Sequence, residues 1–452
     1  MSQHTAWGSR IGFIMTTAGF AVGLGAIWRF PYMMSKNGGG AFLLVYLLTT
    51  LGVGVPLFIA EIVLGRHTRH GIILGLRQLT PKRSPYRLAS YLGVASGMGI
   101  LSYYAVILGL ILVYFVKSLG GAFAYGANMA QYGPLFEHLS SDMPTLVCAV
   151  SAALAIMGGI LRLGLKAGLE RCCTVLMPLL LLFLFILAGR SLSLPGASEG
   201  VSWFIRPDFS RIDVQVALDA LGHTFFAVGI GVSTAFVFGS YLSEQSSIVA
   251  DALIIIALNT AVAILAGLVI FPAMHAFNLT QASGTGLAFE TMPAIFASLP
   301  GGWLFSICFF FLLIISGFAS GLGLLEGVVS TLQEVWGRER NATLALVLSV
   351  IALLSLPALL SYGAHAPLAS VRLGDGSLFV FMEHTVTSLL MPVGALLLSL
   401  FVARRFGFEA FQREANKGAT WCRITRQWRF LVQVAVPCAV GCILLLGIWA
   451  SL

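Results

Sequence analysis

Charged residues are scarce in this sequence. Asp, Glu, Lys and Arg together make up 10% of the 452 residues, whereas hydrophobic residues make up 58%. Soluble domains usually carry about 25% charged residues, so this composition excludes a water-soluble protein and indicates a chain that lies in a lipid bilayer. The apolar runs are continuous, which also excludes a β-barrel, whose strands alternate over about ten residues.

Signals for catalysis and metal chemistry are also missing. The seven cysteines are an odd number and lie mostly in apolar runs, which favours small buried hydrophobic residues over disulfides or metal ligands. The sequence has no HExxH motif, no serine with a histidine and an acid at matching depth, and no P-loop lysine after the glycine-rich turn at 37–42. We therefore expect no enzyme and no enzymatic cofactor.

What the sequence does contain is a series of long apolar runs. A helix needs about 20 residues to cross about 30 Å of hydrocarbon. Eleven stretches meet this length within what we expect to be one domain, 1–452: 11–33, 41–65, 89–116, 144–163, 170–189, 214–241, 248–274, 303–335, 343–362, 378–403 and 428–450.

The basic residues are sorted by loop. If the N-terminus is cytoplasmic, 19 of the 26 Lys and Arg residues fall on the inner side. The positive-inside rule therefore predicts a cytoplasmic N-terminus and an outer C-terminus. The net charge of +8 then needs no nucleic-acid partner.

The stretch Ala18 to Pro31, AGFAVGLGAIWRFP, has an unusual pattern for a spanning helix. It has glycines at 19, 23 and 25 and ends with Arg29 at membrane depth. Each glycine costs about 1 kcal/mol relative to alanine inside a helix, so we interpret the stretch as a span interrupted near residues 23–25. The two ends of such a break can hold a cation and an anionic group. Close helix packing through small residues is the alternative interpretation.

A second interrupted span is predicted at 214–241, where Gly229-Ile230-Gly231 falls at the middle. It is the first span of the second half of the chain, and each half has five spans. Because five is odd, the second half has the opposite orientation, which is typical of inverted-repeat transporters with a midplane site. We predict a first repeat at 11–190, a second repeat at 214–405 and an additional helix at 428–450.

Several polar residues at membrane depth need partners. Arg29 and Glu383 would each be costly alone, so we pair them as an outer gate. On the inner side we expect Trp7, Tyr241 and Glu334 to form a second closure, with His4 within reach.

Two further polar residues lie inside predicted spans. Glu61 follows Pro56, and we interpret it as support for a helix break, with proton handling as the alternative. Asn259 is either an ion ligand or a hydrogen-bonding residue between helices.

Together these motifs resemble the neurotransmitter:sodium symporters, and particularly the bacterial amino-acid transporters of that family. The resemblance covers nearly the whole chain through AGFAVGLGAIWRFP, NGGGAF at 37–42, PLFIAEIVLGR at 56–66, the glycine-rich span at 214–241 and GTGLAFETMPAIF at 284–296. It implies an all-α polytopic membrane protein with a 5+5 inverted-repeat transporter fold, eleven transmembrane helices and discontinuous helices 1 and 6. It also implies a place in the plasma membrane, the bacterial inner membrane.

The resemblance implies a site for an amino acid. Ala21, Gly23, Leu24 and Gly25 would contact the amino and carboxylate groups, and the Tyr104 hydroxyl would bind the carboxylate. Relatives that carry amines have an aspartate at the position of Gly23, so glycine favours a substrate with its own carboxylate. A neutral, hydrophobic or aromatic L-amino acid fits the implied side-chain pocket, which consists of Phe20, Ile100, Phe226, Gly229, Val232, Ser320 and Leu324.

Sodium is the coupling ion that the resemblance implies. The implied ligands are the carbonyls of Gly19, Val22 and Ser316 with the Ser320 hydroxyl at one site, and the Ala21 carbonyl with Asn259 at the other. Alanines at 26, 227 and 319 replace oxygen-bearing side chains of the family pattern, while a tight cage for a hard cation needs about six oxygens. His223, beside Tyr46, is a candidate proton site because imidazole titrates near neutral pH, and a hydrogen-bonded core histidine is the alternative.

The sequence thus favours secondary active transport, a symport of a small amino acid by alternating access. A proton-coupled or sodium-independent transporter or exchanger is one alternative, and a non-transporting solute sensor is another, because the missing ion ligands could reflect lost transport. A channel would need an open polar path or repeated pore loops, which the sequence does not show. The expected partners are the amino acid and the lipid bilayer, and a homodimer is left open.

Overall fold

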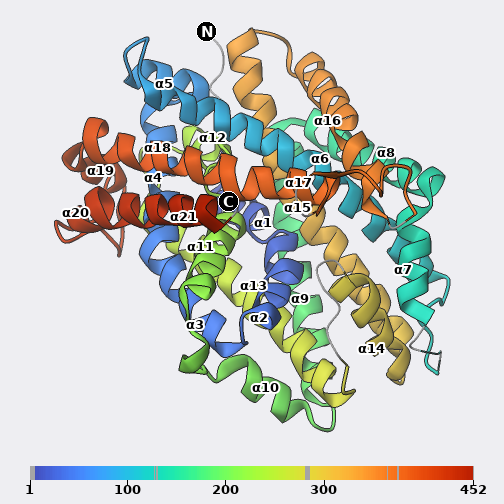
Figure 1. The fold of residues 1–452 in the computed structure, drawn as a ribbon. Helices are drawn as coiled ribbons and strands as arrows, with labels where there is room; N and C mark the ends of the chain where they lie inside the picture. Colours follow the sequence, from blue (N-terminus) through green and yellow to red (C-terminus); the bar gives the residue numbers. More distant parts are fainter. Residues whose placement is uncertain are drawn as a thin grey trace.

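The computed structural model describes residues 6–126, 128, 131–279, 286–363, 365–373 and 376–450, with side chains up to 446. Figure 1 shows that this part of the chain is a bundle of helices with one small β-hairpin, in which β1 (Arg372–Leu373) pairs antiparallel with β2 (Gly376–Ser377). His4 and residues 284 and 285 of the predicted GTGLAFETMPAIF motif lie outside the described residues.

The α-helices are α1 (Arg10–Ala21), α2 (Phe30–Lys36), α3 (Gly40–Thr49), α4 (Val55–Thr68), α5 (Ile72–Leu79), α6 (Leu88–Leu119), α7 (Tyr132–Ser141), α8 (Met143–Arg162), α9 (Arg171–Leu192), α10 (Ala197–Ile205), α11 (Val214–Val228), α12 (Thr234–Ser240), α13 (Ile248–Ala276), α14 (Met292–Ser298), α15 (Gly302–Trp336), α16 (Arg340–Tyr362), α17 (Leu378–His384), α18 (Met391–Phe401), α19 (Phe408–Ala415), α20 (Trp428–Phe430) and α21 (Val436–Ala450). Wider π-helical segments are η1 (Gly25–Arg29), η2 (Thr50–Gly54), η5 (Leu165–Glu170), η7 (Leu287–Thr291), η8 (Thr385–Leu390), η9 (Val402–Phe406) and η10 (Leu431–Ala435). Two short 3₁₀ segments are η3 (Pro85–Arg87) and η6 (Phe209–Arg211).

Most of the π-helical segments have a common cause. The segments η1, η2, η7, η8 and η10 each end two residues before a proline, at positions 31, 56, 293, 392 and 437. Proline lacks an N–H group and its ring clashes with the carbonyl four residues earlier. A locally wider turn, with i→i+5 bonds, relieves that clash without ending the helix. The sequence therefore bends these spans and keeps them helical.

The predicted spans are confirmed as apolar helices. Nine helices in the described residues are long and apolar enough to cross a bilayer, and residues Arg10–Ala21 with Gly25–Lys36 make a tenth as a pair bent by 48°. The remaining predicted stretch, 214–241, is divided between α11 and α12. The total of eleven crossings and the boundaries of the two repeats stay predictions.

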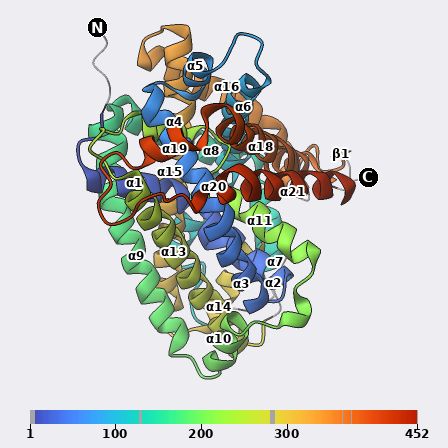
Figure 2. The same cartoon turned by 90° about the vertical axis from the view of Figure 1, so that its left-hand side faces the viewer.

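Helices α6 and α15 form the centre of the bundle. In each, 78% of the apolar 18-residue stretch is buried inside the protein, compared with 39% in α8 and α16. Helices α8 and α16 therefore have faces left for lipid. Helix α15 packs against α6, α9, α1 and α12, and Figure 2 shows α9 and α13 side by side along the molecule. Both interrupted spans therefore lie against the central helices.

Candidate functional site

The first helix break lies where the glycine pattern predicts it. Helix α1 ends at Ala21, and Val22 leaves the helical region with ψ at 39° while its N–H still bonds to the Ala18 carbonyl. The chain resumes at η1, where the Ala26 N–H bonds to the Gly23 carbonyl at 3.1 Å. Val22 and Gly23 thus separate the carbonyl end of α1 from the amide end of the helical turn that begins at Leu24, and the two ends face one gap.

The second break lies between α11 and α12. Gly229 and Gly231 have φ of 69° and 82°, and Ser233 has φ of 68°, so the chain is in the left-handed region at three nearby positions. Glycine adopts this region without steric cost, which explains why glycines occupy two of them. The buried Glu61 carboxylate accepts the Gly231 N–H at 2.7 Å. Glu61 therefore supports the break, as its position after Pro56 indicated.

The two breaks meet at one cavity. The space between the lining side chains is about 370 Å³, of which the centre of a water molecule can reach about 30 Å³. A single water needs about 10–15 Å³ by this measure, so the side chains must move to admit a larger ligand. All twelve residues predicted to bind the amino acid line this cavity: Phe20, Ala21, Gly23, Leu24, Gly25, Ile100, Tyr104, Phe226, Gly229, Val232, Ser320 and Leu324. Their role in binding stays a prediction.

The sequence did not single out Met391, which also lines the cavity. It is the first residue of α18 and is 1% exposed. Its carbonyl lies against Gly231, where a Cβ would come within 2.7 Å. A methionine in an apolar helix has no polar or glycine signal, so nothing in the pattern of 378–403 could have distinguished it.

Gly23 is the position where the backbone comes closest to the polar side chains of the cavity. A Cβ at Gly23 would lie 2.6 Å from the Ser320 hydroxyl oxygen and 3.6 Å from the Tyr104 hydroxyl. The Tyr104 hydroxyl donates to the Gly317 carbonyl at 3.2 Å. Two hydroxyls therefore lie beside a gap that a Cβ at residue 23 would fill, next to the ends of α1 and η1.

The carbonyl end of α1 meets the small-residue face of α15. The Ser316 hydroxyl donates to the Val22 carbonyl at 2.7 Å, and a Cβ at Gly19 would lie 3.2 Å from the Cβ of Ala319. The four ligands predicted for this sodium site thus come from two segments in direct contact, Gly19 and Val22 from the end of α1 and Ser316 and Ser320 from α15. Ala319 presents a methyl group where an oxygen would complete the set.

Asn259 is a predicted ligand of the other sodium site. It is fully buried in α13, and its amide nitrogen donates to the Tyr46 hydroxyl at 3.4 Å. Its amide oxygen has no hydrogen-bond partner among the described residues. An unpartnered buried oxygen costs free energy unless a ligand uses it, and oxygen is the ligand that hard cations prefer. The bond to Tyr46 joins α13 to α3, as the alternative of a hydrogen bond between helices predicts, and the role of the Asn259 oxygen as an ion ligand stays a prediction.

His223 lies in an aromatic cage. The rings of Tyr46, Phe30 and Phe42 are 5.3, 5.7 and 6.1 Å from its imidazole. It is 1% exposed, and within the described part of the chain neither ring nitrogen has a hydrogen-bond partner. The predicted alternative of a hydrogen-bonded core histidine is therefore not what the structure contains. A role in proton transfer stays a prediction.

The predicted outer pair is present but loosely joined. Arg29 and Glu383 approach to 3.9 Å, with side chains 19% and 30% exposed. The guanidinium lies over the Phe226 ring at 4.4 Å, so it covers one wall of the cavity. The residues form an ion pair across η1 and α17 that can tighten by a small movement.

On the N-terminal side, Trp7 and Tyr241 come together as predicted. Their ring centroids are 5.9 Å apart, and the indole N–H donates to the Phe238 carbonyl at 3.0 Å. The Tyr241 hydroxyl donates to Glu326, which pairs with Arg340 at 2.6 Å. Sequence reasoning missed Glu326, although an acid inside the apolar run of α15 was a signal that could have found it.

Glu334, the third residue predicted for this closure, bonds to a different element. Its carboxylate accepts the Gly71 N–H at 2.7 Å and lies 3.7 Å from His70, so it holds the start of α5.

Helix α1 is held instead by two residues that the sequence did not indicate. The Glu170 carboxylate accepts the N–H groups of Gly8 and Ser9 at 2.8 and 3.0 Å.

The second of these residues is Asp251, which is buried in α13 and pairs with Arg10 at 2.7 Å. Glu170, the last residue of η5 directly before α9, and Asp251 of α13 thus attach the start of α1 to two different helical segments. Both are acids near predicted helix starts, where the sequence has many such residues, so the pattern alone did not distinguish them.

Comparison with known proteins gives one consistent result. A family model described as the sodium:neurotransmitter symporter family matches residues 4–134 and 135–451. The sodium-dependent transporter YhdH of Bacillus subtilis is 36% identical over 435 residues, which cover 96% of this chain and 95% of that protein. The sodium- and chloride-dependent GABA transporter 2 of Mus musculus is 27% identical over 464 residues, covering 90% of this chain and 74% of that one.

A comparison with solved structures also gives a match over nearly the whole chain. The crystal structure of MhsT in complex with L-phenylalanine matches with a TM-score of 0.90 at 33% identity, covering 98% of this chain and 99% of that one. The predicted fold class, an all-α membrane protein with two discontinuous helices, is therefore confirmed.

Proposed function

The chain belongs to the sodium:neurotransmitter symporter family, and on this premise we propose that it transports a neutral amino acid with an apolar side chain by alternating access. It is a membrane transporter and not an enzyme. The observation that carries the proposal is the cavity between the two helix breaks. The hydroxyls of Tyr104 and Ser320 converge there with the backbone ends of α1 and η1, which suits an amino group and a carboxylate, and the other walls are apolar.

The closures on both sides of the cavity support alternating access. Arg29 covers the cavity on one side, and Trp7 and Tyr241 lie on the N-terminal side. Helix α1 is joined to η1 through a non-helical gap at residues 22 and 23, and side-chain contacts with η5, α12 and α13 hold it in place. It can therefore move as a unit about that gap once these contacts break.

Coupling to sodium is part of the proposal. The Ala21 carbonyl and Asn259 would hold one ion, and the other would be held by Gly19, Val22, Ser316 and Ser320. A bound sodium ion supplies positive charge beside the substrate carboxylate. The unpartnered Asn259 oxygen supports this assignment.

We expect an inward sodium gradient to accelerate uptake into proteoliposomes at fixed pH. Asn259→Ala should raise the sodium concentration for half-maximal uptake on the order of tenfold, because it removes a direct ligand. Ser349→Ala, on the exposed face of α16, is the control. Uptake that ignores sodium but follows a proton gradient would support the alternative of proton coupling, for which the caged His223 is the candidate.

The outer pair gives a second prediction. Arg29→Ala and Glu383→Ala should each slow uptake, and the double variant should be no slower than the worse single one, with a coupling of about 0.5–1 kcal/mol. The exposed pair Asp208 and Arg211, 3.4 Å apart, is a matched control that should leave uptake unchanged. Additive effects of the Arg29 and Glu383 substitutions would mean that the two residues do not act as a gate.

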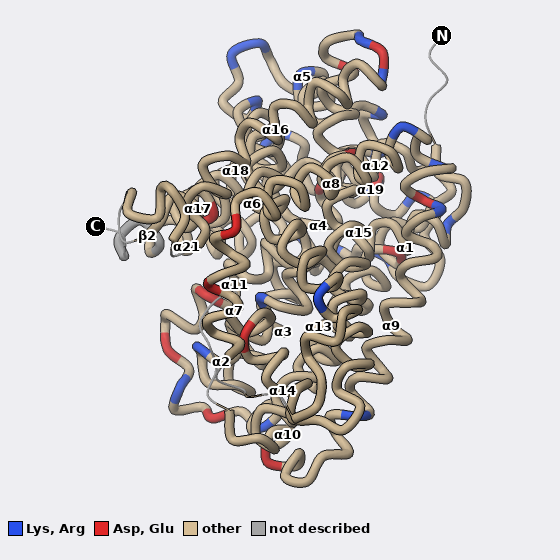
Figure 3. Tube along the Cα trace, turned by 90° about the vertical axis from the view of Figure 1, so that its right-hand side faces the viewer, with Lys and Arg blue, Asp and Glu red and all other residues tan. Residues whose placement is uncertain are grey.

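The direction of the chain in the membrane is also a proposal. We infer a plasma-membrane location with the N-terminus in the cytoplasm and the C-terminus outside. Figure 3 shows Lys and Arg segments in the loop beside α5, which the positive-inside rule assigns to the cytoplasmic side. The proposed orientation is tested with single cysteines introduced into the loop between α5 and α6. In intact cells, a membrane-impermeant thiol reagent should leave these cysteines unlabelled if the loop is cytoplasmic.

Proteoliposome uptake with the twenty amino acids, combined with binding measurements, separates the candidate functions. Saturable accumulation of apolar amino acids is expected. Binding without flux would instead support a solute sensor, and large non-saturating currents would support a channel.

A further inference from the structure

Glu61 is a buried acid whose described partner carries no charge. It lies in the middle of α4 and is 1% exposed. Its Oε1 accepts the N–H of Gly231 at 2.7 Å, whereas its Oε2 has no hydrogen-bond partner in the part of the chain that the structure describes. A neutral backbone group thus holds one oxygen of this carboxyl, and the other oxygen is unused.

Two other buried acids of the spans are in a different situation. Asp251 and Glu326 are both fully buried, and each lies against a guanidinium, at 2.7 Å from Arg10 and at 2.6 Å from Arg340. An ionised carboxylate at such depth is stabilised by a cation of this kind, and without one it is so costly that the group binds a proton instead. Glu61 therefore fits a neutral carboxyl group.

The charged groups of the neighbouring elements do not compensate Glu61. The elements that pack most closely on α4 are η2, α5, α12, α13, α18 and α19, and η2, α12 and α18 have no ionisable residue. On the other elements and on α4 itself, the ionisable side chains have partners elsewhere or are exposed: Arg77 on the Tyr91 hydroxyl, Asp251 on Arg10, His275 on the Phe271 carbonyl, Glu409 on Arg429, Glu414 on Arg66 and His67, and Arg413, which is exposed.

The start of α12, beside the Gly231 bond, has further polar groups without partners. Ser233 and Thr234 are fully buried, and among the described residues their hydroxyls have no hydrogen-bond partner. A Cβ at Gly93 in α6 would lie 3.4 Å from the Ser233 Cβ, and a Cβ at Gly327 in α15 would lie 2.6 Å from the Thr234 hydroxyl oxygen. Helices α6 and α15 thus cover this end of α12, and their separation from α12 would admit water to it.

We propose that Glu61 is a proton-binding site, whose carboxyl carries a proton while the central cavity is closed and gives it to water when α12 separates from α6 and α15. The proton is held on Oε2, and Oε1 accepts the Gly231 N–H in both states, so the helix break stays supported. Closing the cavity around a substrate then takes up one proton from the solution. This link to the substrate rests on the proposed function, whereas the protonation of Glu61 in the closed protein does not.

The protonation is tested by infrared spectroscopy of the purified protein in lipid, which detects the carbonyl band of a protonated carboxyl group. Glu61→Gln keeps an oxygen for the Gly231 N–H but cannot hold the proton. We expect a band at neutral pH that Glu61→Gln removes. Glu326→Gln is the matched control, because Glu326 is equally buried but pairs with Arg340, and it should leave the band in place. A band that persists in Glu61→Gln would overturn the proposal.

A second variant keeps the test decisive if Glu61→Gln does not fold. Glu61→Asp retains an acid at this position. When all glutamate carboxyls are labelled with a heavy carbon isotope, the band of the unmodified protein should lie at the isotope-shifted frequency and that of Glu61→Asp at the unshifted one. A band that stays shifted in Glu61→Asp would show that another glutamate holds the proton, which would overturn the assignment.

The link to the substrate is tested by the pH dependence of amino-acid binding. Because closing takes up a proton, the affinity should fall by up to about tenfold for each unit of rising pH once the open protein has lost this proton. Glu61→Gln should remove this fall. Calorimetry in two buffers that differ in their heat of ionisation should count about one proton taken up per substrate in the unmodified protein and none in Glu61→Gln.

A role of Glu61 in supporting the break alone predicts a different result. Since Glu61→Gln keeps the bond to Gly231, that role would leave the pH dependence and the proton count the same in both proteins, and this outcome would overturn the link to the substrate. If no amino acid binds the unmodified protein, the proposed function fails, while the infrared result still decides whether Glu61 holds a proton.

Discussion

Gly23→Asp is expected to abolish binding of a zwitterionic amino acid, with a loss of affinity of at least about a hundredfold. The new carboxylate would lie in the gap between Ser320 and Tyr104, where a Cβ is already 2.6 Å from the Ser320 oxygen. In our proposal the substrate carboxylate occupies this gap. Two like charges at contact in this narrow and mostly apolar cavity cost several kcal/mol. Isothermal titration with apolar amino acids measures the loss.

The size of the new side chain must be separated from its charge. Gly23→Asn has nearly the same size as Gly23→Asp but no charge, and Gly23→Ala measures the effect of the Cβ alone. We expect both controls to weaken binding and Gly23→Asp to weaken it much further. An amine without a carboxylate, such as phenethylamine, should escape the additional loss. Equal affinities in the Asp and Asn variants would contradict the position of the carboxylate.

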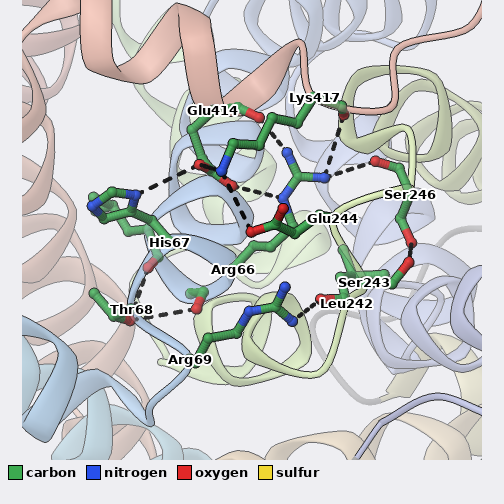
Figure 4. A network of polar contacts seen from close by, with 12 residues as sticks. Arg66, His67, Thr68, Arg69, Leu242, Ser243, Glu244, Ser246, Glu414 and Lys417 are labelled. Atoms are coloured by element: carbon green, nitrogen blue, oxygen red, sulfur yellow. Dashed lines mark hydrogen bonds and ion pairs between the residues drawn. The ribbon is translucent and has the colours of Figure 1, made fainter.

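Arg66→Met is expected to lower the thermal midpoint more than any other single change outside the cavity. The Arg66 side chain is fully buried at the end of α4. Its Nε donates to the Glu414 carboxylate at 2.9 Å, one terminal nitrogen donates to the Ser246 carbonyl at 2.7 Å, and the other donates to the Glu414 carbonyl. Figure 4 shows how these bonds join α4, the segment before α13 and α19.

Breaking a buried ion pair costs about 3–5 kcal/mol, and we expect Arg66→Met to cost about 3 kcal/mol, the lower end of that range, because Glu414 keeps Lys417 at 3.0 Å and His67 at 3.5 Å. Arg66→Lys keeps a charge but not the fork of donors, so it should fall in between. The double variant Arg66→Met with Glu414→Leu removes both charges and should recover most of the loss. Thermal unfolding in detergent, followed by tryptophan fluorescence, compares the four proteins, and a double variant as weak as Arg66→Met would contradict the pairing.

The ion pair between Arg66 and Glu414 leads us to expect that the thermal stability depends on pH. Burial alone would raise the pKa of Glu414, but hydrogen bonds and charges from Lys417 and Arg66 bring the pKa below its ordinary value of 4.5. A carboxylate with a lowered pKa adds stability at pH values above its ordinary value, and this stability is lost as pH falls through the folded-state pKa. The thermal midpoint of the unmodified protein should therefore fall more steeply below about pH 4.5 than that of the double variant. Parallel curves would mean that Glu414 is not the responsible group.

Prediction from the sequence worked best where one residue type has one physical meaning. Glycines at 23, 25, 229 and 231 marked the breaks because glycine is costly inside a helix and tolerated where the chain leaves it. The twelve cavity residues came from the family resemblance, since a pattern of small and apolar residues could equally have meant close helix packing. The gates were only partly predicted, because an acid such as Glu334 or Glu326 can reach several neighbours and the sequence does not show which helix faces it.

The sequence by itself determined that this chain spans a membrane, where its helices are interrupted and which loops carry positive charge, because length, apolar content and glycine position act locally along the chain. Only the tertiary structure decided that Met391 lines the cavity, that Glu170 and Asp251 hold the start of α1, and that Trp7 packs edge-to-face on Phe238 and Tyr241. These contacts join residues far apart in the sequence. Their distances depend on how whole helices pack, and apolar and acidic residues of this kind occur at many positions that could have made the same contacts.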